Sequence, residues 1–243
     1  MISVCLASYN GEKYIKEQLD SILSQLSDED ELIVSDDCSI DSTPEILSSF
    51  AEQYPILRIV KGPGKGVIKN FEYAISLSKG ELLFLSDQDD IWCSSKVSRV
   101  KEAFSSSGEN CMLVLHDAEI VDEDAQRTGQ TLFEFRNSRQ GLLRCLWKNP
   151  YVGCCMAIRK ELTSEIFPFP EGIEMHDWWI ALNAECGGRT MLITDKLIQY
   201  RRHTGNVSNM HHHPLYKMIH NRILFIRVLA LHRLAIKGKF HIR

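Results

Sequence analysis

The first 92 residues alternate between two hydrophobic patterns. Apolar and β-branched residues form short runs, typical of buried strands, at residues 2–8, 31–35, 56–61 and 81–86. Between these runs, apolar residues recur at every third or fourth position, which predicts helices over residues 12–26, 42–54 and 67–78. Strands and helices in this order form βαβ units, whose strands run parallel. The pattern predicts an α/β fold, a Rossmann-like, mostly parallel sheet with helices on both faces.

After Trp92 the pattern is mixed. It predicts helices over residues 96–104, 140–147 and 177–184, strands over residues 112–116, 151–158 and 191–200, and a polar turn region over residues 119–129. A last helix is predicted over residues 214–240, where an apolar stripe recurs with Lys and Arg between its members: Leu215, Ile219, Ile223, Ile226 and Leu229 or Ala230. We therefore expect a basic amphipathic helix near the end of the chain.

The composition is that of an ordinary globular protein, with 44% hydrophobic and 25% charged residues. There is no apolar run of 18 residues or more, and the first residues, MISVCLASYN, lack the basic segment of a secretory signal. The eight cysteines form no C-x-x-C pair, and several lie in apolar runs. We expect buried free thiols, a cytoplasmic protein and no transmembrane helix.

The net charge of −4 conceals an asymmetry. Residues 196–243 contain ten Lys or Arg and no Asp or Glu, whereas the preceding 195 residues contain 18 basic and 32 acidic residues. Such a segment favours a negatively charged partner: a membrane surface, phosphates or nucleic acid. Because no recognition motif accompanies the charge, we expect no nucleic-acid partner. Peripheral contact with an anionic membrane is the preferred interpretation. The alternative is a helix that docks on the rest of the chain or on a second copy in a homodimer.

Acidic and polar residues follow three of the predicted strands. They are Ser8-Tyr9-Asn10, Asp36-Asp37 and the triplet Asp87, Asp89 and Asp90. In an open parallel sheet, ligands bind at the carboxyl ends of the strands, so we expect these clusters to share one edge. Carboxylates this close repel one another unless a cation lies between them. Oxygen ligands favour a hard divalent cation, Mg²⁺ or Mn²⁺, of the kind that carries phosphates.

Other classes of nucleotide-dependent or hydrolytic enzyme fit less well. The turn after the first strand, ASYNGEKY, lacks the G-x-G-x-x-G of dinucleotide-binding enzymes. The segment GPGKG does not match a P-loop, and no G-x-S-x-G is present. What remains is a metal-bound diphosphate held by Asp87 and Asp89, with Asp36 or Asp37 accepting hydrogen bonds from a base or ribose.

Three ordered motifs resemble family 2 glycosyltransferases of the GT-A fold, most closely bacterial, rhamnosyltransferase-like enzymes of surface-polysaccharide assembly: VCLASYNGEKYIKEQLDSILSQ, IVSDDCSIDST and FLSDQDDIW. Later segments agree with recurrent blocks of that family: LHDAEIVD, VGCCMAIRKEL, MHDWWIAL and YRRHTGNVS. The resemblance implies a GT-A domain over residues 1–210, with a nucleotide-sugar half (1–92) and an acceptor half (93–210). A basic helical extension, residues 211–243, would follow.

The resemblance implies transfer of a sugar from a UDP- or dTDP-linked donor to a hydroxyl group, with inversion at the anomeric carbon. The Asp-x-Asp block of the family corresponds to Asp87 and Asp89, which would bind Mg²⁺ or Mn²⁺ and the donor diphosphate. The acidic pair Asp36-Asp37 would bind the base and ribose. Further nucleotide-sugar contacts are predicted at Ala7, Tyr9, Lys69 and Arg201. For Lys69, a solvated helix charge is an equal alternative.

An inverting transfer needs a carboxylate that removes the proton of the acceptor hydroxyl. Asp177 in MHDWWIAL is the candidate, although an Asp before a helix is also a common N-cap. The family often has an acid before this Asp, and here the residue is His176. His203 is the candidate third metal ligand, with a structural histidine as the alternative. Candidate acceptor contacts are Asp117, Trp178 and His176.

Two other functions compete with this interpretation. A non-catalytic nucleotide-sugar-binding or scaffold protein of the same pathway would keep the donor site without the base. A sugar-nucleotide pyrophosphorylase would need a glycine-rich basic loop after the first strand, which ASYNGEKY does not provide. The preferred function is transfer to a glycan or lipid-diphosphate-linked acceptor in capsule or O-antigen synthesis, at the inner face of the cell membrane.

Overall fold

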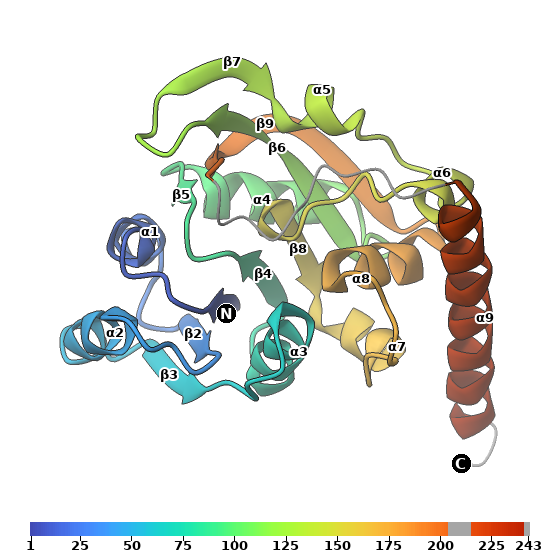
Figure 1. Cartoon of the computed structure of the whole chain (residues 1–243), viewed down its shortest axis with the longest axis horizontal. Helices are drawn as coiled ribbons and strands as arrows, with labels where there is room; N and C mark the ends of the chain where they lie inside the picture. Colours follow the sequence, from blue (N-terminus) through green and yellow to red (C-terminus); the bar gives the residue numbers. More distant parts are fainter. Residues whose placement is uncertain (204–214, 241–243) are drawn as a thin grey trace.

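The computed structural model describes residues 1–203 and 215–240, with the side chains of the second range described over residues 222–235. Within these ranges a nine-stranded sheet runs through the protein in the order β3-β2-β1-β4-β8-β6-β9-β5, and β7 pairs with β6. Helices α1 and α2 lie on one side of the sheet, and α3 and α8 on the other (Figure 1). The predicted α/β fold is confirmed, although its sheet is mixed.

The first half follows the predicted alternation. Its four strands are parallel neighbours: β1 (Ile2–Ser8), β2 (Glu31–Asp36), β3 (Leu57–Lys61) and β4 (Leu82–Ser86). Its helices are α1 (Ile15–Leu23), α2 (Thr43–Ala51) and α3 (Val67–Leu77). Ser8 pairs with Asp36 across β1 and β2, and Leu6 pairs with Ser86 across β1 and β4. The polar residues that follow these strands therefore meet at one edge of the sheet.

The second half adds antiparallel pairs. The strand β8 (Met156–Arg159) is antiparallel to β4 and to β6 (Leu113–Val121), which itself runs parallel to β9 (Thr190–Arg201). The remaining elements are β5 (Ile91–Trp92), α4 (Lys96–Ser106), β7 (Arg127–Thr131), α5 (Leu132–Arg136), α6 (Leu142–Trp147), α7 (Thr163–Ile166), α8 (His176–Glu185), α9 (Leu215–Phe240) and short 3₁₀ helices at Gly153–Cys155 and Lys160–Leu162.

Two predictions for this half were wrong. Residues 119–129 are not a turn region, because β6 continues to Val121 and pairs with β7 at Arg127. The turn is confined to residues 122–126, where the carboxylate of Asp122 accepts the backbone N–H groups of residues 124 and 126. The stretch reads as polar because β7 is exposed over most of its length. Of residues 151–158, only the last three belong to a strand.

All ten residues of α8 are buried. The helix contacts α3, α6 and α7, and Trp178 and Trp179 lie against Phe225 of α9 with ring centroids 5.0 Å and 6.1 Å away. A helix that is covered on every side needs no polar face, which explains the sequence HDWWIALNAE. Burial of α8 holds its first turn, and so Asp177, in a fixed position.

Over the residues whose side chains are described, the last helix packs on the domain along a stripe that shares only Leu229 with the predicted one. Phe225 and Leu229 are buried, whereas Ile223 and Ile226, expected on the apolar face, are 49% and 46% exposed. None of the described helices combines the length and the hydropathy needed to cross a bilayer. The predicted boundary between residues 210 and 211 lies outside the described residues.

All eight cysteines are free thiols, as expected. Five are buried and two are half-buried, and Cys38 is exposed.

Candidate active site

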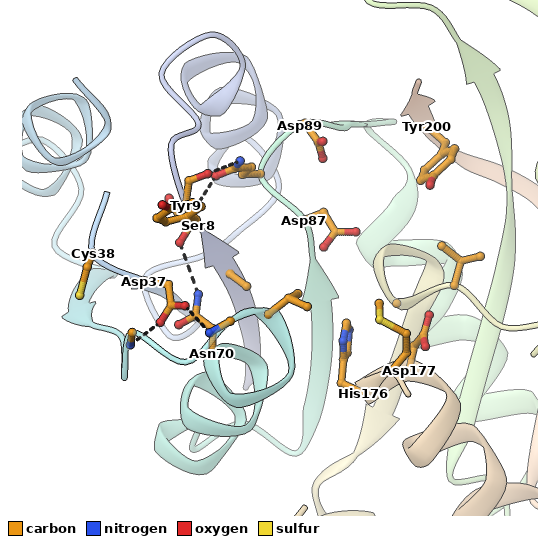
Figure 2. Close-up of a pocket in the computed structure, with 18 of the residues that line it drawn as sticks. Ser8, Tyr9, Asp37, Cys38, Asn70, Asp87, Asp89, His176, Asp177 and Tyr200 are labelled. Carbon is orange, nitrogen blue, oxygen red and sulfur yellow. Dashed lines mark hydrogen bonds between the residues drawn. The ribbon is translucent and has the colours of Figure 1, made fainter. Parts of the chain in front are cut away.

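A cavity of about 860 Å³ opens at the carboxyl ends of β1, β2 and β4 and reaches the first turn of α8 (Figure 2). Eight of the predicted site residues line it: Ala7, Tyr9, Asp37, Asp87, Asp89, His176, Asp177 and His203. The sequence reading missed other lining residues, among them Cys38, Asn70, Gln88 and Tyr200. The cavity therefore joins residues that are up to 196 positions apart in the chain.

Asp37 and a glycine loop form one end of the cavity. The Oδ1 and Oδ2 atoms of Asp37 accept the backbone N–H groups of Gly64 and Gly66 at 2.6 Å and 2.8 Å. Both glycines have positive φ angles, 65° and 82°, which a residue with a Cβ adopts only with strain. A carboxylate has about four lone-pair sites, so Asp37 can still accept a hydrogen bond from a ligand. The segment GPGKG thus positions the carboxylate of Asp37 at the cavity.

Asn70 joins the ends of two strands beneath this loop. Its side-chain amide donates to the carbonyl oxygens of Ser35, at 2.8 Å, and Ser8, at 3.4 Å. Its Oδ1 accepts the hydroxyl of Ser35 at 2.6 Å. Asn70 is 2% exposed. The sequence feature that could have identified it is an asparagine in the first turn of a helix that follows a glycine loop. It holds the floor of the cavity in place.

Gln88, the middle residue of the Asp-x-Asp block, links this block to the turn after β1. Its Oε1 accepts the backbone N–H of Tyr9 at 2.8 Å, and its Nε2 donates to the Tyr9 carbonyl at 2.9 Å. A side chain at Gly11 would overlap the end of the Gln88 side chain and would displace it from these hydrogen bonds. The ring of Tyr9 is 54% exposed at the cavity rim, where an aromatic face is available to a base.

The acidic loop after β4 gathers negative charge. Burial raises the pKa of Asp87 well above its usual range, and the neighbouring carboxylates of Asp89, Asp90 and Asp177 raise it further. Burial and Asp89 raise the pKa of Asp90 to about 7. Asp90 Oδ1 accepts the backbone N–H of Arg201 at 3.1 Å, but Oδ2 has no hydrogen-bond partner among the described residues. When these carboxylates are ionised, they repel one another unless a cation lies between them.

The residues present fit a hard divalent cation. Asp87 and Asp89 face the cavity, and Nε2 of His203 lies 2.7 Å from Oδ2 of Asp89. Ligand atoms of Asp87, Asp90 and Cys154 also lie within 4.8 Å of one another. The second group is the poorer choice, because Asp90 is buried and burial raises the pKa of the Cys154 thiol, which stays protonated. The carboxylate oxygens of Asp87 and Asp89 suit Mg²⁺ and Mn²⁺.

We expect the metal-free protein to lose stability as the pH rises. The folded state holds a proton on Asp90 up to a pH of about 7, whereas an unfolded aspartate releases it near 3.9. The folded state therefore binds more protons in this window, and raising the pH from 5 to 8 should cost about 2–3 kcal/mol of unfolding free energy at this group.

Chemical denaturation in the presence of a chelator measures this effect. Asp90→Asn should flatten the pH dependence, while Asp28→Asn, at an exposed turn, should leave it unchanged. An unaltered slope in Asp90→Asn would contradict the assignment.

Asp177 lies at the opposite end of the cavity from Asp37, facing Asp87 (Figure 2). Its Oδ1 accepts the side-chain amide of Asn149 at 3.0 Å and the backbone N–H of Trp178 at 2.6 Å. Burial raises its pKa to about 6, and these hydrogen bonds and the charge of Arg136 limit the rise. A carboxylate with this pKa is ionised at neutral pH and basic enough to accept a proton. The sequence reading did not identify Asn149.

His176 forms an uncharged wall beside Asp177. Its ring stacks on Phe71, with centroids 3.9 Å apart, and burial lowers its pKa to about 3. Neither ring nitrogen has a partner among the described residues. A Cβ at Gly153 would lie 2.7 Å from Nε2, so this glycine is needed for the ring to fit.

Three predicted nucleotide-binding residues lie outside the cavity. Asp36 accepts hydrogen bonds from the hydroxyls of Ser8 and Ser39, at 3.1 Å and 2.6 Å. Lys69 donates to Glu72 at 2.6 Å and to the carbonyl of Phe169 at 3.2 Å. The guanidinium of Arg201 binds Glu17 at 2.5 Å and the carbonyl of Asp89 at 3.0 Å. The structure shows that these three side chains contact other residues of the protein, and their predicted contacts with the nucleotide sugar stay a prediction.

Two predicted acceptor residues are also placed elsewhere. Asp117 Oδ1 accepts the backbone N–H groups of Ala118, at 2.7 Å, and Phe133, at 2.8 Å. The Trp178 indole is buried and donates to the carbonyl of Cys145 at 2.6 Å. Both side chains stabilise the second half of the domain, and neither lines the cavity.

Comparison with known families supplies the decisive observation. Residues 3–167 match the family described as Glycosyl transferase family 2. The chain belongs to this family. Among curated relatives of this glycosyltransferase, the dTDP-rhamnosyl transferase RfbG of Shigella flexneri is 29% identical over 219 residues, covering 83% of this chain and 72% of RfbG. An uncharacterised protein of Mycobacterium tuberculosis is 26% identical over 211 residues, covering 85% of this chain.

Solved structures confirm the GT-A fold of this glycosyltransferase. Residues 1–349 of TarS from S. aureus, in complex with UDP-GlcNAc, superpose with a TM-score of 0.71 and 20% identity, covering 95% of this chain and 66% of that one. The mannosyltransferase PcManGT of Pyrobaculum calidifontis, in complex with GDP-Man and Mn²⁺, gives a TM-score of 0.64 at 22% identity, covering 80% of this chain and 55% of that one. The glycosyltransferase chain spans 60% of the length of its Mycobacterium tuberculosis relative.

Proposed function

We propose that the protein is a metal-dependent, inverting glycosyltransferase that moves a sugar from a UDP- or dTDP-linked donor to a hydroxyl group of a glycan or lipid-linked acceptor. One observation carries the proposal: the acidic loop of Asp87 and Asp89 and the buried carboxylate of Asp177 face each other across a single cavity. The name of RfbG supports a nucleotide-linked sugar donor, as do the ligands of TarS and PcManGT.

The cavity separates donor binding from proton transfer. Tyr9 and Asp37 line the end of the cavity that would bind the nucleobase of the donor, and Asp87 and Asp89, with His203, would hold the cation. Bound Mg²⁺ or Mn²⁺ supplies positive charge that stabilises the departing diphosphate.

Asp177 accepts the proton of the acceptor hydroxyl as its oxygen forms a bond to the anomeric carbon. The bond from that carbon to the diphosphate oxygen breaks at the same time, and the configuration inverts because attack and departure occur on opposite faces. Asn149 and the backbone N–H of Trp178 keep the Asp177 carboxylate oriented for this step.

The pathway and location are part of the proposal. Curated relatives include a teichuronic acid biosynthesis glycosyltransferase of Bacillus subtilis and an abequosyltransferase of Salmonella typhimurium, in addition to RfbG. The name of the Bacillus subtilis relative supports a role in polysaccharide biosynthesis. The role that we propose is capsule or O-antigen synthesis, in the cytoplasm at the inner face of the membrane.

A thermal-shift panel of nucleotides and nucleotide sugars tests the proposal. We expect UDP or dTDP, with or without a sugar, to stabilise the protein in the presence of Mn²⁺, by about 2.7 kcal/mol at 100 times Kd. The shift should disappear with a chelator. Absence of any nucleoside diphosphate binding with Mn²⁺ would overturn the proposal, and a shift with GDP alone would overturn its pyrimidine part. Binding without donor hydrolysis or transfer would instead favour a non-catalytic nucleotide-sugar-binding protein.

A further inference from the structure

Helix α6 lies beside the N-terminal part of helix α9, although 67 residues separate the two helices in the chain (Figure 1). The guanidinium of Arg222 in α9 donates to the carbonyl oxygen of Trp147 at the end of α6, at 2.9 Å. Exposed side chains of the two helices and of the residue after α6 form what we call the α6–α9 surface: Leu143, Arg144, Trp147, Lys148, Ile223, Leu224, Ile226, Arg227, Leu231 and Leu234.

Helix α9 has two apolar faces. Its inner face is anchored by Phe225 and Leu229, by a hydrogen bond between His232 and the carbonyl of Glu165 at 2.9 Å, and by an ion pair between Arg222 and Glu174 at 2.9 Å. At 100° per residue, Ile226 lies on the flank of the helix, and the opposite face carries four exposed aliphatic residues of the surface: Ile223, Leu224, Leu231 and Leu234. Docking on the domain therefore accounts for one face of α9 and leaves the other without a partner in the described part of the chain.

The exposure on this surface is large for apolar side chains. Leu143 is 83% exposed, Leu231 is 68% exposed, Leu234 is 67% exposed and Trp147 is 57% exposed. Isolated exposed leucines are common, but a group of this size on adjacent helices indicates an interaction site. A tryptophan among leucines and basic residues is typical of the boundary between lipid and water.

The charge of the surface selects its partner. Residues 136–148 contain four basic residues and no acidic one, and residues 215–240 contain six basic residues and no acidic one. Glu174 and Glu165 neutralise Arg222 and Arg233 on the inner face, whereas Arg144, Lys148 and Arg227 are exposed. A second copy of the chain would bring like charges together. A bilayer with anionic headgroups satisfies both the positive charge and the apolar side chains.

We propose that the α6–α9 surface binds the anionic interface of a lipid bilayer. Its leucines and Trp147 enter the boundary between headgroups and acyl chains, and Arg144, Lys148 and Arg227 contact the headgroups. Asn149, which holds Asp177, follows two residues after Trp147 in the chain. Binding here places the Asp177 end of the cavity near the membrane, where a lipid-linked acceptor is present. This last link rests on the proposed function.

Flotation of the full chain with vesicles tests the membrane contact without any substrate. The protein should float with vesicles of phosphatidylcholine mixed with phosphatidylglycerol and stay at the bottom with phosphatidylcholine alone. Leu234→Glu should weaken binding about tenfold or more, since it removes a leucine that the bilayer would bury and adds a negative charge that the anionic headgroups repel. Ile40→Glu is the matched control. Ile40 is 87% exposed, and its substitution makes the same charge change outside the α6–α9 surface.

The electrostatic part has its own pair of variants. Lys148→Gln should weaken binding to the anionic vesicles about fivefold, and Lys79→Gln, also at an exposed position, should not. Thermal unfolding confirms that each variant is folded.

Failure of the unaltered protein to float with anionic vesicles at low salt, or equal flotation of Leu234→Glu and Ile40→Glu, would overturn the proposal. A dimer that Leu234→Glu dissociates, without flotation, would assign the surface to a second copy. Neither result depends on nucleotide binding, so failure of the proposed function would be seen separately.

Discussion

Asp177→Asn should lower the rate of sugar transfer about 10²- to 10⁴-fold while leaving the affinity for the donor unchanged. An amide keeps the size of the carboxylate and can still accept the hydrogen bonds of Asn149 and Trp178, but it cannot accept the acceptor's proton. Transfer assays and calorimetric titration with UDP or dTDP and Mn²⁺ separate the two effects. Full activity in Asp177→Asn would show that another group is the base.

The pH dependence of the unaltered enzyme provides a second readout. Because the base acts in its ionised form and its pKa is raised to about 6, kcat/KM should be constant above this pH and fall as the pH decreases below it. Asn149→Ala removes a hydrogen bond that stabilises the carboxylate, so this acid limb should move to higher pH. A purely structural role for Asn149 would change the rate without moving the limb.

Asp89→Asn should weaken metal-dependent binding of the nucleoside diphosphate about 100-fold or more. Loss of residues that only support metal ligands already costs about 10- to 100-fold in metal affinity, and Asp89 faces the cavity itself. The variant also removes a negative charge that raises the pKa of Asp87, so the remaining carboxylate becomes more easily ionised but holds the cation with one ligand fewer.

Titration with Mn²⁺ followed by UDP or dTDP measures this loss. Asp28→Asn, which removes the same charge from an exposed turn, should bind as the unaltered protein does. His203→Ala should give a smaller loss, since Asp87 and Asp89 remain. Wild-type affinity in Asp89→Asn would show that the cation, if it binds, has other ligands.

Much of the nucleotide half was predictable from local sequence. The alternation of strand and helix periods identified β1 to β4 and α1 to α3, because each strand is buried and each helix has one apolar face. The parallel order then placed Asp37 and Asp87 at one edge of the sheet, and Asp177 was found through its motif. These features depend on neighbouring residues, which a sequence displays directly.

The supporting residues were not predictable, because they act across the fold. Gln88 belongs to the acidic loop, but its partner Tyr9 is 79 positions away. Lys69, Trp178 and Asp117 have residue types suited to a site, yet their side chains are taken by structural partners that only packing brings near. Composition does not show which polar side chains a fold has already satisfied.

The sequence by itself determined an α/β domain of family 2 glycosyltransferase type, an acidic loop after β4 and a basic final helix, since each of these depends on residues that are close together in the chain. Only the tertiary structure decided that Asp177 faces Asp87 across one cavity, and that α9 buries Phe225 while exposing Leu231 and Leu234. The physical reason is burial. Contact between distant segments sets the pKa of Asp177 near 6, and it also determines which face of α9 meets the domain and which meets its surroundings.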